Sequence, residues 1–322
     1  MELILRTFKP HVSIIGAGNV GSATMNALAA WTDPLRLVLL NRTREKAEGH
    51  CWDAEDALSL SADHDMIATD DYAHVAGSDV VIVTAGSRNL PGESRLALTG
   101  RNAATSASIV DRLDEVAPDA VVIVVTNPVD VLARTAIENS ARPNHLVFGS
   151  GTLLDTARLR LQIARTLGVA LADVDTLVIG EHGRTAVPVW SHTTVRGIPI
   201  LEYTTGAQRD ACMAAALGRY DAILTRKGCT NTAIAVCLAA IVRSIVADDG
   251  AIHPVSVRPH PAYGLSRSVV LGLPCSIGRT GVRSQHVLEL TDEERFGLGL
   301  SAATLMTSYE SVLGDNQMVA AG

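Results

Sequence analysis

Short runs that are apolar at nearly every position recur through the first half of the chain. They occupy residues 11–15, 35–40, 79–84 and 120–125. Strands that are apolar at successive positions, and not only at alternate ones, are buried on both faces, as in a parallel sheet covered by helices. Because helix-like stretches separate these runs, the pattern predicts an α/β fold, a Rossmann doubly wound parallel sheet.

The pattern changes after about residue 150. Long helices are predicted over residues 152–167, 205–226, 230–246 and 292–313, and strands over 255–258, 268–271 and 287–290. Shorter apolar or mixed stretches lie at 177–180 and 193–195. No low-complexity linker separates the two halves. We therefore expect two domains in direct contact, residues 1–150 and a second α+β domain over 151–322.

The composition argues against several classes of function. The 322 residues carry a net charge of −7, which argues against a general basic surface for nucleic acid. No apolar run approaches the roughly 20 residues that span a bilayer. The five cysteines show no C-x-x-C pair, so we expect reduced thiols and neither a disulfide framework nor a metal site. We expect a cytoplasmic protein without a nucleic-acid or membrane partner.

A glycine motif directly follows the first apolar run and opens a predicted helix, with the sequence Gly16-Ala17-Gly18-Asn19-Val20-Gly21. Gly16 permits a tight turn, Gly18 lets the backbone approach a pyrophosphate, and Gly21 allows close packing of helix and strand. The free N–H groups of the helix start, around Asn19 and Val20, suit phosphate. The motif predicts that residues 1–150 bind a dinucleotide, against the alternative of a plain glycine turn.

The end of the second apolar run bears on which dinucleotide binds. Asn41 stands 20 residues after Gly21, where an acidic residue would bond the ribose hydroxyls of NAD. Asn41 is uncharged, and Arg42, Thr43 and Arg44 follow it. Because guanidinium groups pair well with phosphate, we predict that NADP(H) is preferred. NAD(H) is the alternative if both arginines lie on a solvated loop.

Further segments resemble one known family. They are Thr84-Ala85-Gly86 followed by Pro91-Gly92-Glu93-Ser94-Arg95, then Thr126-Asn127-Pro128-Val129-Asp130, then Gly149–Arg158, then Gly180-Glu181-His182-Gly183. In this order the chain resembles the L-lactate/malate dehydrogenase family over nearly its whole length, and within it the lactate and 2-hydroxyisocaproate branch. The resemblance implies hydride transfer between a nicotinamide cofactor and a small 2-oxo acid or its L-2-hydroxy acid, in a homodimer or homotetramer.

The resemblance also implies roles for individual residues. Hydride addition to a ketone leaves negative charge on oxygen, which needs a proton donor with a pKa near the working pH, such as histidine. His182 matches that acid, and Asp155 matches the aspartate that orients it. Arg158, three residues later on the same helix face, matches the clamp on the substrate carboxylate. Arg95 matches the arginine that polarises the carbonyl when its loop closes.

The remaining matches concern the cofactor and the substrate side chain. Thr84, Ala85 and Gly86 match cofactor-binding positions, and Asn127 matches a residue that contacts both substrate and nicotinamide. Thr230 matches the threonine of lactate-type pockets.

Other positions depart from the family pattern. Asn89 stands where lactate enzymes have glutamine and malate enzymes arginine, and Arg88 precedes it. Arg219 and Tyr220 stand where small residues are usual. These departures predict a 2-oxo acid with a longer or polar side chain. Two alternatives are a malate-type dehydrogenase that uses Arg88 and a non-catalytic dinucleotide-binding protein on the same fold.

Overall fold

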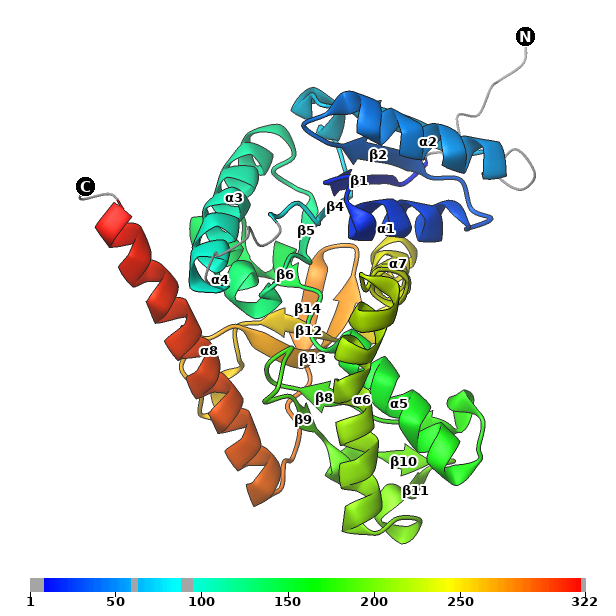
Figure 1. Cartoon of the computed structure of the whole chain (residues 1–322), viewed down its shortest axis with the longest axis vertical. Helices are drawn as coiled ribbons and strands as arrows, with labels where there is room; N and C mark the ends of the chain where they lie inside the picture. Colours follow the sequence, from blue (N-terminus) through cyan, green and yellow to red (C-terminus); the bar gives the residue numbers. More distant parts are fainter. Residues whose placement is uncertain (1–8, 59–62, 88–94, 320–322) are drawn as a thin grey trace.

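A computed structural model describes residues 9–58, 63–87 and 95–319. Its centre is a nine-stranded sheet with the order β14-β13-β12-β6-β5-β4-β1-β2-β3 (Figure 1). Six strands of this sheet run parallel to their neighbours: β1 (His11–Ile15), β2 (Arg36–Leu40), β3 (Asp65–Thr69), β4 (Val80–Val83), β5 (Val121–Val124) and β6 (Val147–Gly149). The predicted Rossmann sheet is therefore confirmed.

Helices join the parallel strands and bury them. They are α1 (Asn19–Ala29), α2 (Arg44–Leu58), α3 (Arg95–Val116) and α4 (Val129–Asn139). Every residue of β1, β4 and β5 is buried, which explains why these strands are apolar at successive positions. The carboxyl ends of β1, β4 and β5 are adjacent at one edge of the sheet, because these strands are neighbours in the order.

The second half of the chain continues the same sheet. Its strands β12 (Ile252–Val257), β13 (Leu271–Gly278) and β14 (Gly281–Gln285) are antiparallel, and β12 pairs with β6 where Ser256 lies opposite Gly149. The two halves are thus joined by backbone hydrogen bonding across β6 and β12. Five two-residue strands lie outside this sheet: β7 (Val174–Asp175), β8 (Val178–Ile179), β9 (Val187–Pro188), β10 (Thr194–Val195) and β11 (Ile198–Pro199).

Four long helices complete the second half: α5 (Leu153–Leu167), α6 (Gly206–Lys227), α7 (Thr232–Ala247) and α8 (Asp292–Val319). Thr205 caps α6 by accepting a hydrogen bond from the Gln208 N–H, and Gly168 and Gly228 end α5 and α6 in left-handed conformation. Helix α7 packs against α1, and α8 runs beside α3 and α4 (Figure 1).

The 3₁₀ turns span Tyr72–Val75, Asn144–Leu146, Leu171–Asp173, Trp190–His192, Ile200–Glu202 and Pro261–Tyr263. Among the described helices, none has both the length and the apolar character needed to cross a membrane.

Some predicted elements are absent or displaced. The strand expected over 287–290 is wrong, because the Tyr263 hydroxyl donates to the His286 carbonyl and accepts from the Leu288 N–H, so a side chain takes the place of a neighbouring strand. The strand expected over 268–271 starts only at Leu271, after a turn in which Ser266 accepts from Val269. Strands β3, β6 and β14 of the central sheet were not predicted: β3 and β14 are partly exposed edge strands, and β6 has three residues.

Candidate active site

The glycine motif packs tightly against the end of β4. Gly16 has a φ of +112°, and a Cβ there would lie 2.8 Å from the Ala85 nitrogen. A Cβ on Gly21 would lie 1.8 Å from the Gly16 carbonyl oxygen. The Thr84 hydroxyl donates to the carbonyls of Ile15 and Gly16 at 3.1 and 3.0 Å. Both glycines are therefore required by backbone packing, and Thr84 holds the motif in place.

Gly18 has a different environment. A Cβ at Gly18 would meet no protein atom within 4 Å. Gly18 is also the N-cap of α1 and has no side chain to accept the N–H groups of the first turn, which Asn19 and Val20 begin. An open space in front of uncapped helix N–H groups fits the pyrophosphate of a dinucleotide.

The predicted ribose-binding segment lies beside this motif. The Asn41 side-chain oxygen accepts from the Ala17 N–H at 3.3 Å, and its amide donates to the Thr43 carbonyl at 2.9 Å. Arg42 and Thr43 are exposed. Arg44 begins α2, and its Nε lies 2.9 Å from a Glu48 carboxylate oxygen in an exposed ion pair. Such pairs are weak, so a bound phosphate can compete for this guanidinium.

The ends of β4 and β5 are linked to one another. The Thr126 hydroxyl donates to the Ala85 carbonyl at 2.8 Å, and a Cβ on Gly86 would lie 2.3 Å from the Thr126 methyl group. Asn127 follows, exposed, and its side-chain oxygen accepts from the Val129 N–H at 3.3 Å. The structure thus brings the predicted cofactor positions together at the carboxyl edge of the sheet, the usual ligand-binding edge of such folds.

A histidine, an aspartate and an arginine form a contiguous group. His182 lies in the loop after β8, and its Nδ1 is 2.5 Å from Asp155 Oδ2. Arg158 lies one turn beyond Asp155 on α5, and its Nη1 is 3.3 Å from Asp155 Oδ1. The side chains are 22%, 7% and 10% exposed for His182, Asp155 and Arg158. Because Asp155 keeps a proton on Nδ1, Nε2 is the nitrogen that can exchange a proton with a substrate.

The surroundings of His182 favour its protonated form. Burial lowers the pKa of the imidazole, but the charge and hydrogen bond of Asp155, with a smaller contribution from Asp130, raise it by more. Arg158 opposes this in part. The net effect is a pKa of His182 above its ordinary value of 6.5, as suits a group that donates a proton near neutral pH.

Asp130 and Ser256 belong to this group, although sequence reasoning gave them no role. Asp130 Oδ2 accepts from the backbone N–H of His182 at 2.7 Å, and Oδ1 accepts from the Ser256 hydroxyl at 2.6 Å. The sequence offered one indication for Asp130: its carboxylate, in the Asn-Pro-Val-Asp segment, stands among apolar positions of a helix. Nothing in the local sequence indicates that Ser256 reaches it.

The loop between α6 and α7 reaches the glycine motif. Asn231 donates to the Asn19 carbonyl at 3.2 Å and accepts from Lys227 Nζ at 2.6 Å. Thr230, half-buried, immediately precedes it. The end of α6 also borders a groove of about 420 Å³, lined by Arg219, Ala222, Ile223, Arg226 and Lys227. Tyr220 on the same helix is also exposed but is not among the residues that line the groove.

Three residues named from the sequence are not placed. Arg88 and Asn89 lie outside the described residues. Arg95 is the first residue of α3, but its side chain also lies outside what the structure describes.

The dinucleotide-binding edge and the neighbouring histidine–aspartate pair define a class of protein: oxidoreductases that use a nicotinamide dinucleotide. The chain matches the family description "lactate/malate dehydrogenase, NAD binding domain" over residues 10–149 and "lactate/malate dehydrogenase, alpha/beta C-terminal domain" over residues 152–314. The chain belongs to the lactate/malate dehydrogenase family.

Individual relatives agree with this assignment. The chain is 38% identical over 305 residues to an L-lactate dehydrogenase of Salinibacter ruber, covering 92% of this chain and 96% of that one. It is 36% identical to L-lactate dehydrogenase B of Hordeum vulgare, covering 91% and 88%. Among solved structures, a lactate dehydrogenase from a deep-sea metagenome library superposes with a TM-score of 0.91 at 29% identity, covering 95% of this chain and 99% of that one. The minor L-lactate dehydrogenase of Enterococcus mundtii gives 0.88 at 31% identity, covering 94% and 98%.

The protein is therefore a 2-hydroxyacid dehydrogenase that binds a nicotinamide dinucleotide. The alternative of a non-catalytic dinucleotide-binding protein is not retained, because the relatives are named as enzymes.

Proposed function

We propose that the enzyme interconverts a 2-oxo acid and its L-2-hydroxy acid, with His182 as the acid and base. In this proposal residues 1–150 bind the cofactor, and residues 151–322 contribute most groups that face the substrate. The single observation that carries it is the 2.5 Å contact between His182 Nδ1 and Asp155, with Arg158 on the same carboxylate.

The protein groups act on charge and protons. When bound, the nicotinamide would supply or accept the hydride. His182 Nε2 donates a proton to the ketone oxygen during reduction, and Asp155 stabilises the imidazolium before that transfer. The guanidinium of Arg158 has five N–H donors, and its contact with Asp155 uses one of them, so a bidentate contact with the substrate carboxylate remains feasible. Arg95 would polarise the carbonyl, and Asn127 would contact substrate and nicotinamide.

Replacing His182 tests this mechanism. His182→Asn is expected to lower kcat by about 10³-fold or more, because the proton donor is lost, with little change in cofactor affinity. Steady-state kinetics and cofactor fluorescence titration measure the two quantities. Near-normal kcat in this variant would refute the assigned role.

We also propose that NADP(H) is preferred over NAD(H). Support comes from the uncharged Asn41 beside the glycine motif and from the exposed Arg42, Thr43 and Arg44 that follow it. The test compares kcat/KM for NADPH and NADH in the wild type and in Asn41→Asp. The wild type should favour NADPH, and the variant should shift toward NADH because a carboxylate repels the 2′-phosphate. Equal values, or a preference of the wild type for NADH, would contradict the proposal.

The substrate we propose is a 2-oxo acid with a side chain longer or more polar than that of pyruvate. Arg219 and Lys227 line the groove of about 420 Å³ at the end of α6, and Lys227 connects through Asn231 to the segment that contains Thr230. A panel of pyruvate, 2-oxobutyrate, 2-oxoisocaproate, phenylpyruvate, oxaloacetate and 2-oxoglutarate decides the question. A highest kcat/KM with pyruvate would show that the enzyme is an ordinary lactate dehydrogenase. A highest value with oxaloacetate would favour the malate-type alternative that uses Arg88.

For the assembly we propose a homodimer or homotetramer. Large apolar side chains are exposed on three separate helices, with Trp52 on α2 62% exposed, Val236 on α7 60% and Phe296 on α8 77%. Covering these side chains with a second copy of the chain would remove apolar surface from water, which favours association. Light scattering after size-exclusion chromatography measures the number of subunits, and a monomer at micromolar concentration would contradict the proposal.

A further inference from the structure

Asp130 is a buried carboxylate directly behind the loop that carries His182. It lies in the first turn of α4 and is 3% exposed. One of its oxygens accepts the backbone N–H of His182, and the other accepts the hydroxyl of Ser256 on β12, which is fully buried. Asp130 therefore ties three separately positioned segments together: α4, the junction of β6 and β12, and the His182 loop.

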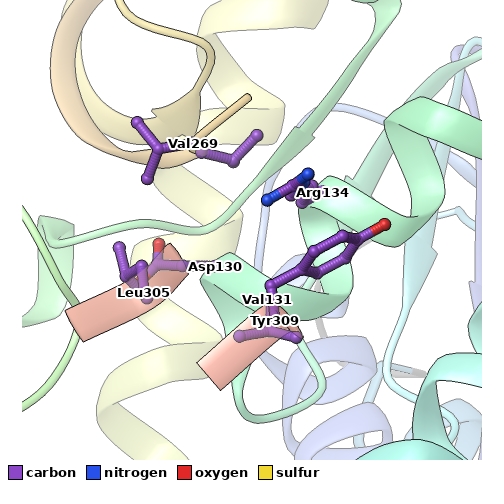
Figure 2. A pocket seen from close by; sticks show the side chains of 7 residues that line it. Asp130, Val131, Arg134, Val269, Leu305 and Tyr309 are labelled. Atoms are coloured by element: carbon purple, nitrogen blue, oxygen red, sulfur yellow. The ribbon is translucent and has the colours of Figure 1, made fainter. Parts of the chain in front are cut away.

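Its other neighbours are largely apolar. Asp130 borders a narrow pocket with Val269 and Leu305, which Figure 2 shows beside it. Arg134, one turn further along α4, lines the same pocket but is engaged elsewhere: its Nε lies 2.9 Å from a Glu138 oxygen, and its guanidinium stacks 3.5 Å from the centre of the Tyr309 ring.

The ionisable groups around Asp130 and His182 can be named from each neighbouring element. The loop contributes His182 itself and Glu181, whose carboxylate accepts from the Thr185 N–H. Helix α5 contributes Asp155 and Arg158, and α7 contributes Cys237, a neutral thiol whose pKa burial raises to about 12. Strand β12 contributes the neutral Ser256. Within this set, two carboxylates contact His182. Asp130 contacts its backbone N–H, and Asp155 contacts its ring.

We propose that Asp130 is a positioning residue for proton transfer: its carboxylate fixes the backbone of His182 and supplies a second negative charge to the imidazolium. The proposal rests on the proposed function of His182 as acid and base, and goes beyond it by assigning a residue that touches neither substrate nor cofactor.

The direction of the charge effects is consistent with this role. Burial raises the pKa of Asp130 to about 6, and the hydrogen bonds from Ser256 and from the His182 backbone limit that rise. Asp130 is therefore ionised at neutral pH, where its charge contributes to the raised pKa of His182. The Asp130 carboxylate contacts the backbone of His182 and acts on its imidazole only through its charge.

Asp130→Asn tests the charge while preserving the shape. The amide oxygen can still accept the His182 N–H, and the Ser256 hydroxyl can turn to accept from the amide. We expect the pKa of His182, followed by NMR of the imidazole, to fall by about 1 unit, since an opposite charge at this range stabilises the protonated form. The His182→Asn variant assigns the signal by its absence.

Kinetics give a signature that a purely structural role would not produce. In Asp130→Asn a smaller fraction of His182 is protonated. At pH values above the pKa of His182, kcat/KM for reduction of the 2-oxo acid falls by up to about tenfold, and well below that pKa it is unchanged. Oxidation of the 2-hydroxy acid, which needs neutral His182, instead gains activity on the acidic side. The pH profiles of both directions should therefore shift toward lower pH together.

Two further variants keep the test decisive. Asp79→Asn is the matched control, because Asp79 also accepts a backbone N–H, that of His11 at 2.8 Å. Asp79 directly precedes β4, so it lies at the amino end of the parallel strands, opposite the carboxyl edge. The pH profiles of reduction and oxidation should therefore not shift in this variant. Ser256→Ala leaves the carboxylate in place with one donor fewer, which raises the pKa of Asp130 and should move the His182 midpoint down by a smaller amount. It also serves as the test if Asp130→Asn does not fold.

The outcomes separate this inference from the proposed function. An unshifted imidazole titration in both Asp130→Asn and Ser256→Ala would overturn the inference, as would an equal loss in both directions at every pH. Near-normal turnover of His182→Asn would overturn the proposed function, while the imidazole titrations would still report whether Asp130 acts on His182.

Discussion

Asp155→Asn should convert His182 from a proton donor to a neutral imidazole at neutral pH. The carboxylate contacts Nδ1 at 2.5 Å, and the side chains of Asp155 and His182 are 7% and 22% exposed. Opposite unit charges about 4 Å apart attract by about 4 kcal/mol at an effective dielectric constant near 20, which is a factor of about 10³ in an equilibrium constant. Without that attraction, burial and the nearby Arg158 both lower the pKa of His182, and only Asp130 opposes them.

The assay is the change in absorbance of the reduced nicotinamide in both directions over a range of pH. A raised pKa increases the protonated fraction of His182 near neutral pH, and losing that rise would remove much of the proposed acid from the reduction. We expect kcat/KM for the 2-oxo acid to fall by about 10³-fold at neutral pH, with partial recovery as the pH is lowered. Oxidation of the 2-hydroxy acid should lose much less, because it begins with neutral His182.

Two controls define the result. The affinity for the cofactor alone should not change, because Asp155 lies on α5 and not at the glycine motif. Asp173→Asn removes a half-buried carboxylate that pairs with the exposed Arg196, away from His182, and should leave both directions unchanged. An equal loss in reduction and oxidation at all pH values would show that Asp155 supports the fold of the site and not the protonation of His182.

The remaining predictions concern stability and the cofactor. Gly21→Ala should lower the free energy of unfolding by about 1–3 kcal/mol in urea titrations, because its Cβ would lie 1.8 Å from the Gly16 carbonyl oxygen; unchanged stability would show that the close contact relaxes at little cost. Gly18→Ala, which meets no protein atom, should keep wild-type stability but weaken cofactor binding at least tenfold in fluorescence titrations. Arg142→Ala should cost about 3–5 kcal/mol of unfolding free energy, because it leaves Asp114 and the carbonyls of Leu113 and Ala117 without their buried partner; a loss below 1 kcal/mol would contradict this.

Strands buried on both faces were predictable, whereas strands defined by tertiary neighbours were not. Residues 80–83 and 287–290 both look like strands locally. The former segment is enclosed between β1 and β5, but the latter segment bonds to the Tyr263 hydroxyl, about two dozen residues away in sequence. A hydrophobic pattern records burial and not the identity of the hydrogen-bond partner, so it could not distinguish these two cases.

In the candidate site, too, local features were predictable from the sequence and long-range contacts were not. The glycine motif and the spacing of Asp155 and Arg158 are local features, and the structure has them in the expected arrangement. The contact of His182 with Asp155 spans 27 residues and was expected only through the family resemblance. The bond between Asp130 and Ser256 spans 126 residues and depends on how β12 joins β6, which no local pattern specifies.

His182 is held by side chains from both sides of the expected domain boundary at residue 150. Its ring is bonded by Asp155 from α5, and its backbone is bonded by Asp130 from α4, which follows β5 of the parallel sheet. Since Ser256 on β12 also bonds Asp130, the group formed by His182, Asp155 and Asp130 lies where the sheet passes from its parallel to its antiparallel part. A fragment that ends at residue 150 would keep the glycine motif and the open space at Gly18, but it would lack both His182 and Asp155, which contacts the imidazole ring. The proposed cofactor site and the proposed proton donor therefore lie in different parts of the sequence, while the geometry of His182 depends on contacts from both halves of the chain.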